Sequence, residues 1–289
     1  MSFVEDFKNI FTRSGNGLMR IILINVIVFI FINIVDQLIK FTGNGTSLVY
    51  WFALPGNAIL ALKHGWAFIT YMFLHEGLMH ILFNMLWLYW LGKIFVEYVG
   101  SKRLVAVYLL GGICGGILYI LSSMVFPLYF YNTFLLGASA GVMAVVIATA
   151  ILLPDYVIHL LFFGGVKLKY LALASFILTS ILDISQNTGG KISHIGGALF
   201  GIIFMIQYKN GNDITKPIVV FLDWTFSLFS KRSKIKISYR RKKSDDDYNT
   251  NQRLKQQKIN SILDKISKSG YEALTKEEKD FLFKASGRN

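Results

Sequence analysis

Cysteine is nearly absent from this 289-residue sequence, which contains only Cys114. A single cysteine excludes an intrachain disulfide, and its place within an apolar run gives no information about the redox compartment. Charged residues are also scarce, at 16% of the chain, whereas hydrophobic residues make up 54% and the mean hydropathy is +0.49. A soluble domain needs no such excess of apolar residues, so the composition indicates a protein with several membrane-spanning segments.

Acidic residues are few compared with basic ones, 17 against 30, and the formal net charge is +13. A basic balance of this size is also found in proteins that bind nucleic acid. Here the lysines and arginines lie between the apolar runs and in the C-terminal tail, which is the distribution of cytoplasmic loops in membrane proteins. We therefore expect a lipid bilayer, and not nucleic acid, to be the partner of this charge.

Six apolar runs are predicted to be membrane segments, and both termini are expected on the cytoplasmic side, because that topology fits every Lys and Arg cluster. No A-x-A-like cleavage site follows the first run, so it is expected to remain as an anchor. The fourth run is short for a full span, and its start is expected to lie below the outer surface. The predicted segments are 18–41, 78–99, 104–126, 138–153, 168–184 and 192–208.

The regions outside these segments have a different character. Residues 1–17 have an apolar helical face and are expected to form an interfacial helix, and the linker 42–75 is interpreted as an outer loop partly embedded in the interface. Residues 209–250 contain an aromatic amphipathic stretch, a basic run at 231–243 and a polar linker, 244–250, predicted to be disordered. Residues 251–289 are predicted to be a soluble helical appendage, broken at Ser269–Gly270 and capped at Thr275.

Small residues recur at helical spacing in two of the runs, and this spacing is typical of helices that pack closely in membranes. In the fourth run the small residues fall on one stripe, and Ser139 points roughly away from it. The third run carries Gly111, Gly112, Gly115 and Gly116, and the stripe of the fourth run consists of Gly137, Gly141, Ala144 and Ala148.

Ser139 lies in the sequence GASAG, 137–141, at the start of the fourth run. Small neighbours allow backbone N–H groups and a substrate carbonyl to approach its hydroxyl, and a helix N-terminus offers unpaired donors for an oxyanion. Gly, Ala and Ser are also ordinary packing residues in membrane helices, so this motif alone does not identify a nucleophile.

The second run begins with two histidines and an asparagine. His75 and His80 suggest the zinc motif H-E-x-x-H, but the second histidine comes one residue late, and on a helix the two side chains would diverge by about 140°. His80 and Asn84 are four residues apart and share a helical face, so both can donate hydrogen bonds to one oxygen. An oxyanion site is therefore favoured over a metal site, and no metal or other cofactor is expected.

His194 lies within the sixth run, where an ionisable side chain is costly unless it has a function. Gly197 and Gly201 follow on the same side and would let a partner helix approach the imidazole. The alternative is a histidine that merely bonds a neighbouring carbonyl. A histidine that accepts the proton of Ser139 would activate the hydroxyl, and since no acidic residue lies at matching depth, the pair is predicted to be a dyad.

Taken together, GASAG at 137–141, the His75, His80 and Asn84 spacing, and the His194, Gly197 and Gly201 spacing resemble the rhomboid intramembrane serine proteases. The resemblance covers roughly residues 18–208. It implies an all-α, six-transmembrane-helix bundle in which Ser139 is the nucleophile, His194 the base, and His80 and Asn84 oxyanion donors alongside the Ser139 N–H. It also implies an acyl-enzyme mechanism without metal or ATP, and single-pass membrane proteins as substrates.

The chain departs from the common rhomboid pattern at three positions: Ala67 follows Trp66 where many members have arginine, Ala140 follows the serine where many have glycine, and Met143 replaces an aromatic residue. None of these departures removes a catalytic group. Two other readings stay open, an inactive relative that binds transmembrane clients and a transporter, although the chain shows no repeated halves. We expect a bacterial cytoplasmic membrane protein; its oligomeric state does not follow from the sequence.

Overall fold

The computed structural model describes residues 16–43, 45–160, 164–182, 187–229 and 245–285. The chain divides into two compact units, Met1–Ser230 and Lys231–Asn289, which are described separately below. The predicted interfacial helix therefore lies almost entirely outside the described residues, as does the basic run at 231–243.

Among the described residues of the first unit, four helices are long and apolar enough to cross a membrane. At 1.5 Å per residue, their 21 to 26 residues span about 31 to 39 Å, against about 30 Å for the hydrocarbon core. Two shorter apolar helices, α9 (Ser139–Leu152) and α10 (Leu168–Ser180), accompany them. The four long helices are α2 (Gly17–Thr42), α6 (Leu78–Tyr98), α7 (Ser101–Val125) and α11 (Thr188–Lys209).

Each of the six predicted segments coincides with one of these helices, but α7 begins three residues earlier than predicted and two other boundaries differ by four residues. The fifth helix ends at Ser180, four residues earlier than predicted, and α11 begins at Thr188, four residues earlier. The side chain of Asn187 accepts a hydrogen bond from the Gly190 N–H, 3.2 Å, and thereby caps the start of α11. Hydropathy marks where a chain is apolar, whereas caps decide where a helix begins.

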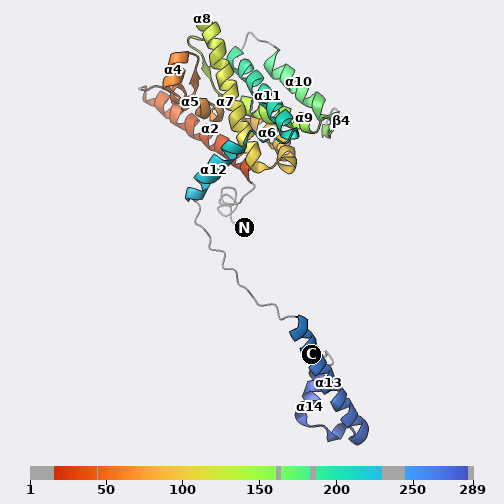
Figure 1. Ribbon diagram of the computed structural model, residues 1–289. Helices are drawn as coiled ribbons and strands as arrows, with labels where there is room; N and C mark the ends of the chain where they lie inside the picture. Colours follow the sequence, from red (N-terminus) through yellow and green to blue (C-terminus); the bar gives the residue numbers. More distant parts are fainter. Residues whose placement is uncertain (1–15, 44, 161–163, 183–186, 230–244, 286–289) are drawn as a thin grey trace. The chain divides into compact units, whose positions relative to one another are not determined.

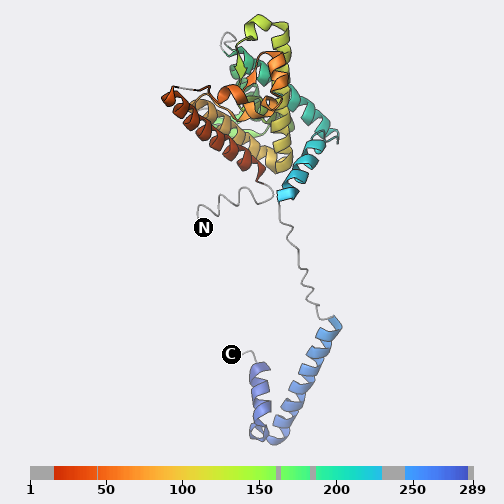
Figure 2. The same ribbon diagram turned by 90° about the vertical axis from the view of Figure 1, so that its left-hand side faces the viewer.

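Helix α9 lies between α7 and α11, which also contact each other, and α6 contacts α9 from another side. Figure 1 shows these helices gathered together, with α2 at one side of the group and α10 at the other. Figure 2 shows the same unit after a quarter turn, with α12 (Lys216–Phe229) at one end of it. Two salt bridges join the start of α7 to residues in and just before α12. Lys102 pairs with Asp223 and Arg103 pairs with Asp213, each at 2.7 Å.

Close contacts between α9 and its neighbours occur at glycines, as the small-residue spacing predicted. A Cβ atom placed on Gly111 of α7 would lie 2.3 Å from the Ala144 Cβ, and one on Gly115 would lie 2.6 Å from the Ala140 Cβ. On the opposite side, a Cβ on Gly197 of α11 would lie 2.1 Å from the Ala140 carbonyl oxygen. A real Cβ atom at any of these positions would overlap its neighbour, so these helices can pack this closely only with glycine there.

The outer segment between α2 and α6 is not an irregular loop. It folds into α3 (Val49–Phe52), α4 (Ala58–Lys63), α5 (Ala67–Thr70) and a 3₁₀ turn, η1 (Tyr71–Phe73). Trp66 Nε1 donates to the Trp51 carbonyl, 2.8 Å, and the Tyr71 hydroxyl donates to the Gly112 carbonyl of α7, 2.6 Å. Side-chain hydrogen bonds thus join parts of this segment to each other and to α7.

The expectation of an all-α fold was incomplete, because the described part of the first unit also contains two small antiparallel sheets. In one, β1 (Leu54–Pro55) pairs with β2 (Phe134–Leu135), which follows the short helix α8 (Pro127–Phe130). In the other, β3 (Val157–Leu160) pairs with β4 (Gly164–Lys167) between α9 and α10. Strands of two to four residues are too short to show a period-2 pattern in a sequence.

The second unit consists of α13 (Asp245–Ser269), a 3₁₀ turn at Tyr271–Ala273 and α14 (Lys276–Ala285). The predicted break falls at Gly270, which has φ 79°. The predicted cap is a reciprocal pair: the Thr275 Oγ1 accepts from the Glu278 N–H, 3.3 Å, and a Glu278 carboxylate oxygen accepts from the Thr275 N–H, 2.8 Å. The bond from the Thr275 N–H and the bond from the Lys265 ammonium both lower the pKa of Glu278.

The expectation of disorder in the linker was wrong for residues 245–250, which form the first turns of α13. Three consecutive aspartates, Asp245, Asp246 and Asp247, stand at the start of this helix. Negative charge at a helix N-terminus interacts favourably with the helix dipole, so the same residues that indicate a polar linker also favour helix initiation.

Candidate active site

Ser139 is the first residue of α9, and its local fold depends on the glycine two positions before it. Gly137 has φ 125°, a region that L-residues rarely adopt, and its N–H donates to the Tyr71 carbonyl, 2.9 Å. This bond fixes the chain as it passes from β2 into α9. The first bond of the new helix runs from the Val142 N–H to the Ala138 carbonyl, 3.0 Å, so the N–H groups of residues 139–141 precede the hydrogen-bonded ladder.

The side chains of His80 and Ser139 converge above Gly137. A Cβ atom placed on Gly137 would lie 3.0 Å from His80 Nε2 and 3.6 Å from Ser139 Oγ. Glycine thus leaves the space between an imidazole nitrogen and a hydroxyl open at the N-terminus of a helix. A carbonyl carbon near Ser139 Oγ could therefore have its oxygen close to both the imidazole and the backbone donors.

Asn84 lies one turn after His80 on α6, is 8% exposed, and donates from Nδ2 to the His80 carbonyl, 3.1 Å. The shared face predicted from their spacing is therefore present. An amide nitrogen carries two hydrogens, so this bond leaves one of them for another acceptor.

His75 does not lie on α6, and the angular argument applied to it was wrong for that reason. The helix begins at Leu78, after an extended Gly77, and the bend brings the His75 and His80 rings together, with centroids 5.0 Å apart and planes at 73°. The described residues contain no cluster of three or more His, Cys, Asp or Glu side chains able to hold a metal. Burial, reinforced by His80, lowers the pKa of His75 to about 3, so its ring is neutral at pH 7.

His194 Nδ1 lies 3.1 Å from the backbone carbonyl oxygen of Thr179 on α10. A carbonyl only accepts, so Nδ1 carries the hydrogen, and the neutral ring presents the lone pair of Nε2 on its other side. No residue type in the sequence marks this partner, because a backbone carbonyl is present at every residue. Within the described parts of the chain, no hydrogen bond joins Ser139 directly to His194.

Gly197 and Gly201 hold α11 against α9, as their spacing after His194 predicted. A Cβ on Gly201 would lie 2.5 Å from the Ala144 carbonyl oxygen. If α11 met only the Ser139 side of α9, the small-residue stripe, which points away from Ser139, would pack against other helices. Gly141 does so, because it contacts Tyr108 of α7. Ala144 does not, because it contacts both Gly111 of α7 and Gly201 of α11 and so lies between two helices.

The three departures from the common pattern are accommodated in different ways. Ala67 is fully buried beneath the outer segment, and Trp66 next to it stacks on His64 with centroids 4.8 Å apart. Ala140 fills the space between Gly115 and Gly197, and Met143 is buried on α9. Trp51 also stacks on His64, so this aromatic cluster anchors the outer segment without an arginine.

Comparison with known proteins gives two family matches. A family described as Rhomboid domain matches residues 62–210, and a family of unknown function, DUF6576, matches residues 242–288. Among curated proteins, relatives named Rhomboid protease GlpG from Salmonella paratyphi A and Salmonella typhi are each 31% identical over 104 residues. The alignment covers 36% of this chain and 34% of each relative, so the chain matches about a third of the length of these relatives.

Proposed function

Because the chain belongs to the rhomboid family, we propose that it is an intramembrane serine endopeptidase that hydrolyses a peptide bond in or near transmembrane segments of other proteins. The observation that carries the proposal is the convergence of His80 and the Ser139 hydroxyl above Gly137, at the unpaired N-terminus of α9. The names of the relatives, Rhomboid protease GlpG, agree with it.

In this mechanism His194 is the general base. Its Nδ1–H bond to the Thr179 carbonyl fixes the tautomer whose Nε2 can accept a proton, the role that a carboxylate has in a triad. Nε2 takes the Ser139 proton as Oγ attacks the substrate carbonyl carbon. The tetrahedral intermediate then expels the amine, which receives the proton from Nε2, and leaves an ester on Ser139. Water, deprotonated by Nε2, hydrolyses that ester and restores the hydroxyl.

The oxyanion of the tetrahedral intermediate is stabilised by His80, by Asn84 and by the N–H of Ser139. These donors come from two helices, α6 and α9, whose relative position is fixed by packing before any substrate binds. Donors that need no reorganisation stabilise developing charge most effectively. Catalytic hydrogen bonds are often long without substrate and tighten when it binds, so a dyad is compatible with the lack of a direct Ser139–His194 bond among the described residues.

The proposed topology has six membrane segments, α2, α6, α7, α9, α10 and α11, with both termini in the cytoplasm of a bacterial cell. Positive charges at 102–103, 167–169 and 209 then lie on the cytoplasmic side. Ser139 opens the short helix α9 and is therefore placed below the outer surface. Substrates are single-pass membrane proteins, and α13 and α14 form a soluble appendage.

The test measures cleavage of single-pass proteins in liposomes by the wild type and by Ser139→Ala, His194→Ala and the double variant. Each single change should abolish cleavage, and the double variant should be no worse, because residues that act as a unit are not additive. Ser122→Ala is the matched control, since that hydroxyl bonds only the Leu118 carbonyl of its own helix, and it should retain activity. Substantial residual proteolysis in Ser139→Ala would refute the assignment.

A further inference from the structure

A network of buried polar side chains joins three elements next to the candidate active site. Asn25 of α2, Tyr71 of η1 and Tyr108 of α7 are each 0% exposed. Asn25 Nδ2 donates to the Tyr108 hydroxyl oxygen, 3.3 Å, and the Tyr108 hydroxyl donates to the Met72 carbonyl, 3.0 Å. A phenol hydroxyl has one hydrogen to donate, and the Met72 carbonyl receives it while Asn25 occupies the oxygen. The two partners together fix the orientation of this hydroxyl.

The carbonyl that Tyr108 binds is next in sequence to the carbonyl that holds the start of the site. The Gly137 N–H donates to the Tyr71 carbonyl, 2.9 Å. The following carbonyl, that of Met72, receives the Tyr108 hydroxyl. Peptide groups are rigid planes joined at one Cα atom, so a displacement of the Met72 carbonyl moves its neighbour. Because Gly137 borders the space of the proposed oxyanion site, the Tyr108 hydroxyl acts on that site through two consecutive backbone groups.

The ring of Tyr108 also supports the helix that begins with Ser139. A Cβ atom placed on Gly141 would lie 2.9 Å from Tyr108 Cδ2 and 3.1 Å from Tyr108 Cε2, so the ring lies directly against the first turn of α9. The ring of Phe73 in η1 is a further neighbour, with centroids 6.1 Å apart. One side chain thus contacts both backbone segments that define the site, the turn η1 and the start of α9.

The network leaves one of its polar atoms without a partner, which makes it a poor source of stability. Asn25 Nδ2 also donates to the Ile21 carbonyl of its own helix, 2.8 Å, but Asn25 Oδ1 is buried and has no hydrogen-bond partner among the described residues. A buried acceptor without a partner lowers the free energy of unfolding, and leucine, which has the same branching as asparagine, carries no such cost. Polar side chains within membrane helices are costly and are commonly functional. What the network positions therefore explains it better than stability does.

We propose that Tyr108 and Asn25 are positioning residues for the proposed active site. The Tyr108 hydroxyl fixes η1, whose Tyr71 carbonyl binds Gly137, while the Tyr108 ring fixes the start of α9 and Asn25 orients the hydroxyl. This role rests on the proposed function, since the groups that it positions are the Ser139 hydroxyl and the donors to the oxyanion. Both side chains are fully buried and cannot touch a substrate. Their loss therefore lowers the rate of attack by Ser139 and leaves substrate binding unchanged.

The experiment compares full-length variants by kcat and KM for a single-pass protein in liposomes and by Tm in detergent. Tyr108→Phe, which removes one oxygen, should lower kcat about tenfold and leave KM within about twofold, because about 1 Å of misplacement costs about 10²-fold and the loss of one hydrogen bond moves the turn by less. Tyr119→Phe is the matched control: it removes an equally buried hydroxyl from the same helix, one that bonds the Thr133 hydroxyl instead. It should lower the Tm similarly and leave kcat unchanged.

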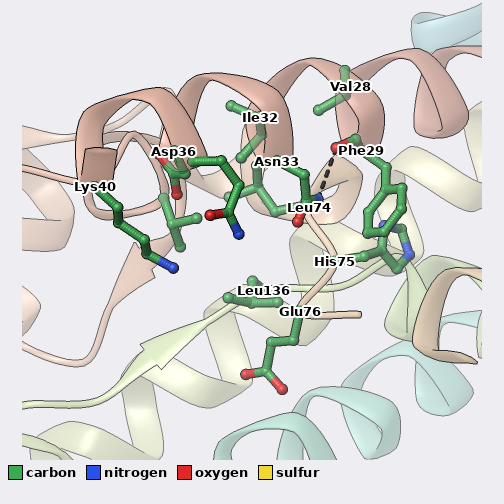
Figure 3. Close-up of a pocket in the computed structure, with 12 residues that line it drawn as sticks. Val28, Phe29, Ile32, Asn33, Asp36, Lys40, Leu74, His75, Glu76 and Leu136 are labelled. Carbon is green, nitrogen blue, oxygen red and sulfur yellow. Dashed lines mark hydrogen bonds between the residues drawn. The ribbon is translucent and has the colours of Figure 1, made fainter. Parts of the chain in front are cut away.

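A double variant separates positioning from stability. Asn25→Leu with Tyr108→Phe replaces both partners of the side-chain bond by apolar groups, so its Tm should lie closer to that of the wild type than the Tm of Tyr108→Phe does. Its kcat should nevertheless remain about tenfold low. Asn33→Leu is the control on α2, because the exposed Asn33 donates from Nδ2 to the Phe29 carbonyl of its own helix, 2.8 Å (Figure 3). It should leave kcat unchanged.

Two results would overturn the positioning role: a kcat of Tyr108→Phe equal to that of Tyr119→Phe, or a kcat that recovers with the Tm in the double variant. Labelling with a fluorophosphonate probe separates this role from the proposed function. Ser139 should label in the wild type, and about tenfold more slowly in Tyr108→Phe. If both label at one rate, only the positioning role fails. If Ser139 does not label in the wild type, the proposed function fails, and the positioning role fails with it.

Discussion

Helices α9 and α2 are both strongly apolar, yet they are buried to very different extents. Ten of the 14 residues of α9 are buried, whereas α2 buries five of its 26. The difference follows from side-chain size: α9 presents Gly and Ala to glycines of α7 and α11, while α2 presents Ile, Leu and Phe to its surroundings. Apolar side chains gain nothing by leaving lipid, so close packing in a membrane requires small residues. Ser139, the proposed nucleophile, is the first residue of the helix that has this close packing.

The largest effect is expected where a side chain is added to the contact between α11 and α9. In Gly201→Leu the new Cβ would lie 2.5 Å from the Ala144 carbonyl oxygen, so the helices must separate. A displacement of about 1 Å at a reacting pair can cost 10²-fold in rate, and we expect turnover to fall by at least that amount. Overpacking should also lower stability by about 1 to 3 kcal/mol.

Turnover and thermal stability of Gly201→Leu should be compared with those of Ile203→Leu, a control on the exposed side of the same helix. The control should behave as the wild type. Normal turnover in Gly201→Leu would show that these glycines do not set the distance between Ser139 and His194.

The next effect concerns Asn84, one of the proposed oxyanion donors. Asn84→Ala should lower kcat by about 10² to 10³, the usual cost of one lost donor, with a smaller change in KM. Gln207→Ala, which removes an amide bonded to Asn212 at the far end of α11, should leave kcat unchanged. Equal losses in the two variants would indicate a structural role for Asn84. A second measurement adds a chelator and then zinc: loss and recovery of activity would instead make His75 and His80 metal ligands.

A smaller effect separates the two faces of α2 itself. Ile21 is 4% exposed and Ile30 is 51% exposed on the same helix. Ile21→Ala should cost about 2 kcal/mol or more, because it leaves a cavity, whereas Ile30→Ala should stay within about 0.5 kcal/mol. Thermal unfolding in detergent measures both. Equal losses would mean that Ile30 is covered by protein, and the contrast between α2 and α9 would then be overstated.

The smallest effect is expected from removing the second unit. Truncation after Lys243 removes α13 and α14, which belong to a compact unit of their own. Cleavage by the truncated protein should equal that of the full chain. A truncated protein that inserts normally but cleaves nothing would place the second unit within the active fold.

The positions of the membrane helices could be predicted because hydropathy and the spacing of small residues are properties of single segments. The glycine contacts at 111, 115, 197 and 201 could be predicted for the same reason, and the structure confirms them. Contacts that depend on how segments meet were not predictable. The Thr179 carbonyl beside His194 has no side chain to mark it, and the proximity of His75 to His80 arises from the bend at Gly77.

In two other places the same residues favour two different structures. Ala144 belongs to the stripe of α9 but contacts both α7 and α11, because a helix between two others can present small residues to each. The composition of Asp245–Asp247 is typical of a polar linker, but aspartates are also favoured at the start of a helix. The structure has the helix, because α13 begins at Asp245.

The central claim is that Ser139 is a nucleophile activated by His194. Its most direct test is to treat the purified protein with a fluorophosphonate serine probe and to locate the adduct by peptide mass spectrometry. The wild type should carry one adduct, on Ser139, and His194→Ala should label far more slowly. Labelling at another serine, or equal labelling rates in the wild type and His194→Ala, would contradict the account.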